Sequence, residues 1–159
     1  MTIRRGGQLD DASHRLLAAW AADCAEHVLD LFTTIRPLDD RPAAAIATAR
    51  RWAAGEVNQL AARRAAYAAH AAARETSGAA QAVARAAGQA VSTAHMADHE
   101  LGAAFFALRA VKAAAPDDPE AVAREQRWQL SRLPPAVAEL VLDDMRRRAD
   151  KFGSAFGPS

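Results

Sequence analysis

The sequence has few of the residues that mark disulfide-bonded, zinc-cysteine or membrane proteins. Its 159 residues include a single cysteine, Cys24, which excludes an intramolecular disulfide and a four-cysteine zinc site. No run of about 18 apolar residues could cross a membrane, and residues 1–7 are not followed by the apolar stretch of a signal peptide. We therefore expect a cytoplasmic protein that does not enter a membrane.

An excess of charge of one sign is also absent. Lysine and arginine number 20 against 19 aspartate and glutamate residues, for a formal net charge of +1. This balance argues against DNA, RNA or an anionic membrane as the main partner. The chain also lacks the GxGxxG, GxxxxGK[ST], GxSxG and HExxH motifs. No familiar nucleotide-binding, hydrolase or zinc-protease signature therefore points to its function.

Alanine is abundant, and it sets the expected fold class. It accounts for 44 of the 159 residues, and it is the strongest intrinsic helix former. Apolar residues recur with helical spacing, and no segment shows the apolar–polar alternation of a strand. We predict an all-α protein with one domain over residues 9–150, flanked by flexible segments at 1–8 and 151–159.

Proline, glycine and capping residues divide this domain into about six to seven helices. Short loops between them favour antiparallel neighbours, and HEAT-like pairs are an alternative for which we find no repeat near 40 residues. The segment 79–115 is predicted as two helices or as one helix bent near Ser92. The expected helices are 9–33, 42–54, 56–75, 79–115, 120–131 and one that opens at Pro135.

Candidate chemistry rests on histidines within these helices. His95, Asp98 and His99 are spaced i, i+3 and i+4, so one helix face would present all three. Imidazole and carboxylate groups at this spacing can hold a divalent metal or transfer a proton. The same spacing also suits a structural face on which Asp98 fixes the tautomer of a histidine.

His27 shares the apolar stripe of the first helix with Trp20 and Cys24, so we expect it to point inward. Asp23 lies one turn earlier, where it could orient His27 as a base or join it as a metal ligand. The structural alternative is a core histidine that hydrogen-bonds a neighbour. Cys24 is expected to be a buried structural thiol, and His14 is expected to lie in solvent.

His70 lies between Tyr67 and Arg74, and the guanidinium of Arg74 could bind a carboxylate or phosphate. If the first, third and fifth helices are neighbours, four histidines converge on one inter-helix pocket. The candidate catalytic or metal-binding residues are then His27, His70, His95 and His99, with Asp23, Arg74, Asp98, Trp20 and Tyr67 as candidate binding residues. The pattern requires no cofactor, although a divalent metal held by these histidines and Asp98 is compatible with it.

Five segments, in order, resemble the Imm-5-like family of small helical bacterial immunity proteins. They include WAADCAEHVL at 20–29, RWAAGE at 51–56, AAHAAAR at 68–74, AAGQAVSTAH at 86–95 and EQRWQ at 125–129. The resemblance extends over roughly residues 14–148. It implies an all-helical domain that binds and neutralises a toxin, and it carries no catalytic residues over to this chain.

Three functions remain open at this point. The first is an immunity-like protein that neutralises a cognate toxin through protein–protein contact. The second is a small helical enzyme or ligand-binding protein whose histidine-lined pocket performs proton-transfer or metal-assisted chemistry as a lyase, isomerase or cyclase. The third is a structural or scaffold role. The sequence does not predict the oligomeric state.

Overall fold

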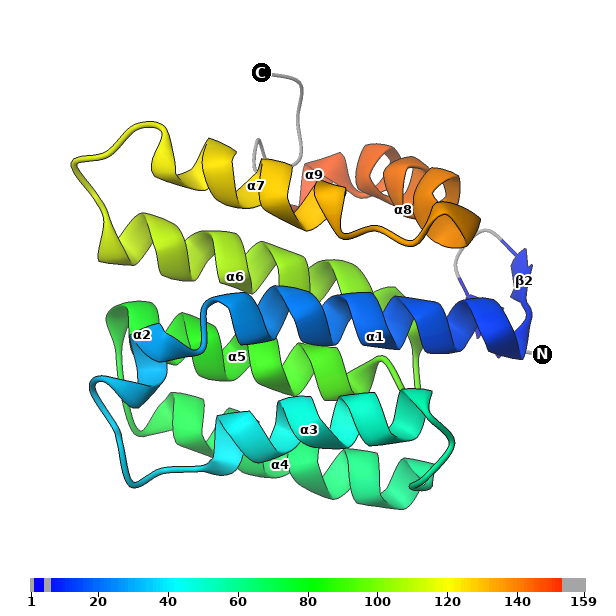
Figure 1. The fold of residues 1–159 in the computed structure, drawn as a ribbon, viewed down its shortest axis with the longest axis horizontal. Helices are drawn as coiled ribbons and strands as arrows, with labels where there is room; N and C mark the ends of the chain where they lie inside the picture. Colours follow the sequence, from blue (N-terminus) through cyan, green and yellow to red (C-terminus); the bar gives the residue numbers. More distant parts are fainter. Residues whose placement is uncertain (1, 5–6, 153–159) are drawn as a thin grey trace.

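The computed structural model describes residues 2–4 and 7–152, and it confirms the all-α bundle (Figure 1). No helix in this part of the chain is long and apolar enough to cross a membrane. The elements in chain order are β1 (Thr2–Arg4), β2 (Gly7–Leu9), α1 (Asp11–His27), α2 (Asp30–Thr33), α3 (Arg41–Ala53), α4 (Gln59–Arg74), α5 (Gly78–Ser92), the 3-10 helix η1 (Ala97–His99), α6 (Glu100–Ala114), α7 (Ala121–Ser131), α8 (Pro135–Arg147) and α9 (Ala149–Phe152).

The N-terminal segment differs from the prediction that the chain has no strands. β1 and β2 pair as an antiparallel hairpin, with Thr2 opposite Leu9. Leu9 is buried and joins a core cluster with Leu17 and Trp20, so the apolar end of this hairpin packs onto the bundle. In the predicted flexible tail at 151–159, residues 151–152 end α9, and 153–159 lie outside the described residues.

Helix α5 occupies the centre of the bundle. It packs against α1, α3, α4 and α6, and most of its side chains are buried. In Figure 1, α3 and α4 lie below α1 and α5, while α6, α7 and α8 lie above them. The three helices that carry a candidate histidine, α1, α4 and η1, therefore all contact α5.

The core differs in composition between its two sides. Where α3, α4 and α5 meet, it consists almost entirely of alanine, with Ile46 and Val91 as its largest buried members. Small side chains let the helix backbones approach closely. On the other side, α1, α6 and α8 enclose larger side chains, including Trp20, Leu101 and Val141. Bulky anchors are thus concentrated in the half that holds the C-terminal helices, with Phe32 of α2 as a large buried side chain outside it.

Most predicted boundaries are confirmed, and their causes are local. Asn58 begins α4 by accepting a hydrogen bond from the Ala61 N–H at 3.0 Å. Gly55, after α3, adopts the left-handed conformation with φ +81°. The predicted break near Ser92 separates α5 from η1 and α6.

The prediction of one continuous helix from residue 9 to 33 is confirmed as far as His27 and is wrong beyond it. The chain leaves α1 at Val28 and turns into the short α2. This turn brings Phe32, which is fully buried, into a cluster with Val83 of α5 and Ala107 of α6. Burial of this aromatic ring, rather than any proline or glycine, accounts for the break.

Candidate functional site

The candidate histidines lie in two places. The His95 and His99 rings are 5.3 Å apart, and His70 is near enough that a proton on its ring lowers the pKa of His99. His27, by contrast, lies beside Val111 near the end of α6, whereas His99 directly precedes its start. The 15 residues of α6 separate them, about 22 Å of helix. His27 therefore does not join the other three histidines in one pocket.

His95, Asp98 and His99 do not share the face of a continuous helix, which corrects the prediction from their spacing. His95 lies in the turn after α5, and Asp98 and His99 lie in η1. His99 donates from Nδ1 to Gln89 Oε1 at 2.7 Å. Burial, His95 and Arg148 lower the pKa of His99 to about 4. The His99 ring is therefore neutral at pH 7, and its Nε2 keeps an acceptor lone pair.

His70 packs against the backbone of α5 at Gly88. A methyl group at Gly88 would lie 2.6 Å from the His70 ring, so the glycine is required for this close approach. Arg85 Nη1 lies 3.3 Å from His70 Nδ1, and a guanidinium can only donate. Burial, Arg85 and Arg74 lower the pKa of His70. His70 is thus a neutral acceptor beside cations.

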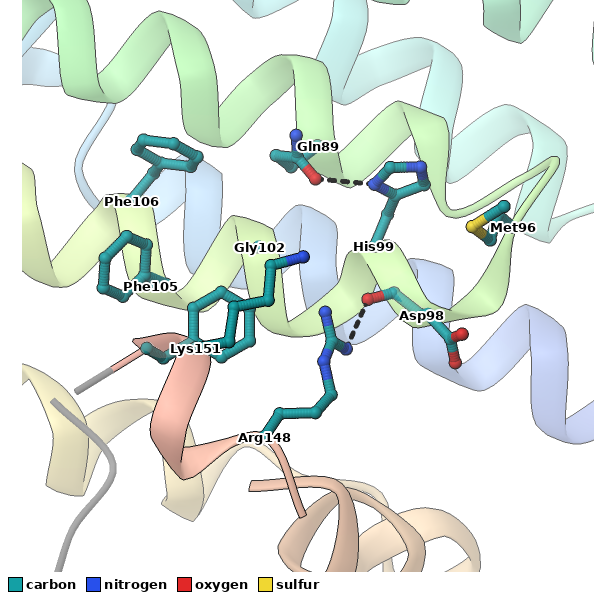
Figure 2. A pocket seen from close by; sticks show the side chains of 10 residues that line it. Gln89, Met96, Asp98, His99, Gly102, Phe105, Phe106, Arg148 and Lys151 are labelled. Carbon is teal, nitrogen blue, oxygen red and sulfur yellow. Dashed lines mark hydrogen bonds between the residues drawn. The ribbon is translucent and has the colours of Figure 1, made fainter. Parts of the chain in front are cut away.

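A hollow of about 310 Å³ opens beside His99, and Figure 2 shows it from close by. Gln89 lies against Gly102 there, where a larger residue would collide with its amide. Arg148 Nη1 donates to the backbone oxygen of Asp98 at 2.6 Å. The lining combines polar, cationic and aromatic groups: Gln89, Met96, Asp98, His99, Gly102, Phe105, Phe106, Arg148, Lys151 and Phe152.

Three carboxyl groups meet next to this hollow, and two of them were missed by the sequence analysis. One carboxylate oxygen from each of Asp98, Glu100 and Asp144 lies within 4.8 Å of the other two. Glu100 begins α6, and Asp144 belongs to α8. Asp144 follows Val137 and Val141 on the buried stripe of its helix. A carboxylate at that position of an apolar stripe is the signal that could have revealed the cluster.

His27 is more exposed than predicted, and its partner is not Asp23. Its side chain is 39% exposed and donates from Nδ1 to the buried Glu125 at 2.7 Å. Its ring stacks on Trp128 at 3.5 Å with an interplanar angle of 5°. Asp23 instead pairs with Arg50 at 2.9 Å. The pair of His27 and Glu125 joins α1 to α7.

The remaining predicted residues divide between the core and the surface. Trp20 is fully buried and donates from Nε1 to the Gln129 oxygen at 2.8 Å, so it is a structural anchor. His14 is also buried, contrary to expectation, and it donates from Nε2 to the Thr93 oxygen. Cys24 is buried as expected, and burial raises the pKa of its thiol. This thiol is therefore not a nucleophile in the folded protein.

Tyr67 and Arg74 lie on the solvent side of α4. We call this side the α4 outer face and define it by Leu60, Arg63, Arg64, Tyr67 and Arg74, all of which are exposed. They lie within about 100° of one another around the helix, opposite a buried side made only of alanine. Arg74 therefore does not reach the hollow beside His99.

The fold and these features define an all-helical bundle with an exposed arginine-rich face and a hollow of mixed polar and aromatic lining between α5, α6 and α9. The family model described as "Imm-5 like putative immunity protein" matches residues 7–136. The chain belongs to this family, which confirms the resemblance found in the sequence. No curated protein and no solved structure matches the chain.

Proposed function

We propose that this protein is an immunity protein that binds a toxin protein through the α4 outer face and so neutralises it. The family assignment supports the immunity role, and the composition of the α4 outer face carries the choice of surface. Tyrosine and arginine are the side chains that most often dominate the energy of protein interfaces.

The arginines of the α4 outer face are available to a partner. Within residues 2–4 and 7–152, Arg63, Arg64 and Arg74 form no ion pair. Tyr67 and Leu60 lie among them, 72% and 55% exposed. Because α4 contains no acidic residue, this face is a cationic strip with apolar contacts. Charge complementarity predicts an acidic partner surface, to which arginine can bind carboxylates in bidentate fashion.

The loop between α2 and α3 extends this surface at the C-terminal end of α4. Arg41 pairs with both Asp39 and Glu75, at 2.7 and 2.6 Å, and Glu75 directly follows α4. These pairs hold the loop in place while Leu38, at 99% exposed, projects from it. A loop that is already ordered loses less conformational entropy when a partner binds.

A competition assay in the protein's own host tests both parts of the proposal. A strain lacking the gene should be inhibited when it is grown with its parent, and the wild-type gene should restore its growth. The triple variant Arg63→Glu, Arg64→Glu, Arg74→Glu should fold, as measured by circular dichroism, but fail to restore growth.

A matched variant controls for the change in charge. Arg109→Glu, Arg127→Glu and Arg132→Glu alter three exposed arginines of the α6–α7 side by the same charge, and this protein should protect fully. A deletion strain that grows normally beside its parent would overturn the immunity role. Protection by the α4 triple variant would overturn only the choice of surface.

A second candidate function has one specific observation in its favour. The exposed ring of His27 is held by the buried carboxylate of Glu125, which is the arrangement of a histidine that transfers protons. If the protein acts as an enzyme there, His27→Gln should abolish protection in the same assay, while the α4 triple variant retains it.

A further inference from the structure

Helices α4 and α5 carry positive charge with no acidic residue of their own to balance it. They contain no aspartate or glutamate, and their four arginines are Arg63, Arg64, Arg74 and Arg85. Glu75, in the turn between the two helices, is already paired with Arg41. The formal net charge of the whole chain is only +1, so this pair of helices holds a local excess of positive charge.

Arg85 is the arginine of this group that the structure holds most closely. Its side chain is half-buried, and its Nη1 donates to His70 Nδ1 at 3.3 Å. In the part of the chain that the structure describes, Arg85 forms no ion pair with a carboxylate. A partly desolvated charge is normally paired with an opposite charge. Arg85 has only a neutral imidazole, so its environment favours an additional anion.

A second guanidinium acts on the same imidazole. Burial lowers the pKa of His70, and the charges of Arg85 and Arg74 lower it further. The ring cannot move towards α5, because it already lies against the backbone of Gly88. Two cations therefore act on one neutral ring, and an anion bound between them would reduce their mutual repulsion.

We propose that Arg85, His70 and Arg74 form a subsite for one carboxylate group of an acidic protein partner. This inference rests on the proposed function, because the subsite borders the α4 outer face. Arg63, His70 and Arg74 lie within about 40° of one another around α4, on the edge of that face next to α5. A guanidinium can bind a carboxylate in bidentate fashion, and partial burial of Arg85 strengthens such a hydrogen bond relative to one in open solvent.

Binding at this subsite should be accompanied by uptake of a proton. His70 accepts from Arg85 only while its Nδ1 is unprotonated, because a protonated imidazole has donors alone. A carboxylate that accepts from both side chains favours the charged form of His70 and raises its pKa. The charged or titratable groups that act on His70 or lie near it are Arg74 of α4, Arg85 of α5 and His99 of η1, and none is an acid. The affinity should therefore increase as the pH falls from 7 to 5, by at most about tenfold per pH unit for one proton.

NMR spectroscopy of the histidine rings in the full-length protein tests the subsite in the absence of a toxin. Disodium glutarate is the carboxylate probe, and sodium chloride at equal ionic strength is its control. Saturating glutarate should raise the pKa of His70 by about 1. The resonance of His70 is assigned by its loss in His70→Gln. The His27 resonances should not respond to glutarate, because His27 lies beside α7.

A pair of matched variants locates the response. Arg85→Gln should abolish the effect of glutarate on His70, whereas Arg127→Gln, which removes an exposed arginine of α7, should preserve it. In the competition assay, Arg85→Gln should weaken protection and Arg127→Gln should not. If Arg85→Gln does not fold by circular dichroism, Arg74→Gln, at an exposed position, takes its place.

Three results would overturn the proposal. The first is a response of His70 to glutarate that equals its response to sodium chloride or persists unchanged in Arg85→Gln. The second is a larger response to sodium phosphate than to glutarate, which assigns the subsite to phosphate groups. The third is full protection by an Arg85→Gln protein that no longer responds to glutarate, which separates the subsite from the toxin-binding surface. Failure of the immunity role is seen instead in the deletion strain, and it does not affect the glutarate titration.

Discussion

Replacement of Gly88 by alanine tests the packing of His70 against α5. An ideal Cβ at position 88 would lie 2.6, 2.7 and 2.8 Å from three atoms of the His70 ring. Contacts this short cannot persist, so either the ring or the α4–α5 packing must shift. Because the buried apolar contact between α4 and α5 consists mainly of alanine side chains, it contains no long apolar side chain that could rearrange to absorb the shift.

Two opposing effects set the expected magnitude. Alanine is favoured over glycine inside a helix by about 1 kcal/mol. Overpacking of a well-packed site costs about 1–3 kcal/mol. Gly88→Ala should therefore lower the free energy of unfolding by about 0–2 kcal/mol. In a His70→Ala background the obstacle is absent, and the same substitution should raise the free energy of unfolding by about 1 kcal/mol.

Urea unfolding of the wild type, both single variants and the double variant, followed by circular dichroism, measures this coupling. The effect of Gly88→Ala should differ between the two backgrounds by about 1–3 kcal/mol. An equal gain in stability in both backgrounds would refute the assignment of this space to His70.

Three further perturbations test the core and its titration. Because burial raises the pKa of the Cys24 thiol, native protein should not react with DTNB at pH 8, whereas the urea-unfolded chain should release one equivalent; rapid reaction of native protein contradicts the burial. Trp20→Phe removes the indole donor from the backbone oxygen of Gln129, which keeps the Arg132 N–H at 3.2 Å, and leaves part of the indole space unfilled; it should cost about 1–3 kcal/mol in urea unfolding, more than Trp52→Phe at its half-buried position, and equal costs count against this role. The pKa of His70 is lower in the folded state than in the unfolded chain, so the unfolded chain binds a proton at His70 more tightly. The contribution of His70 to the free energy of unfolding is therefore complete above about pH 6.5 and is lost as the pH falls towards the lowered pKa. His70→Gln should reduce that loss between pH 7 and pH 5, and an unchanged loss would contradict the lowered pKa.

The fold was largely predictable because residues at or next to the helix ends determine most of the helix boundaries. Pro42 and Gly55 bound α3, and the break after Ser92 was visible in the sequence. The end of α1 was not, because no proline or glycine lies at Val28. At that point the chain turns, and Phe32 is buried against α5. The position of this helix end depends on tertiary packing, which the local sequence does not reveal.

The site was less predictable, because its partners are distant in sequence. His27 was recognised as a candidate, but its partner Glu125 is 98 residues away, and no periodicity within one helix could pair them. Asp98 was recognised for its neighbouring histidines, whereas its carboxylate meets Asp144 of α8. Helix spacing reports which residues share a face, and it does not report which faces meet.

The all-alanine inner side of α4 would separate the proposed recognition surface from the residues that stabilise the bundle. Ala62, Ala66, Ala69, Ala72 and Ala73 make up all of its buried residues. Apart from His70, which packs against Gly88, the large side chains of the helix lie where they do not affect packing. The α4 outer face can therefore diverge rapidly while the bundle stays the same. A chain built in this way can follow a changing partner by substitution at a few positions, without compensating changes in its core.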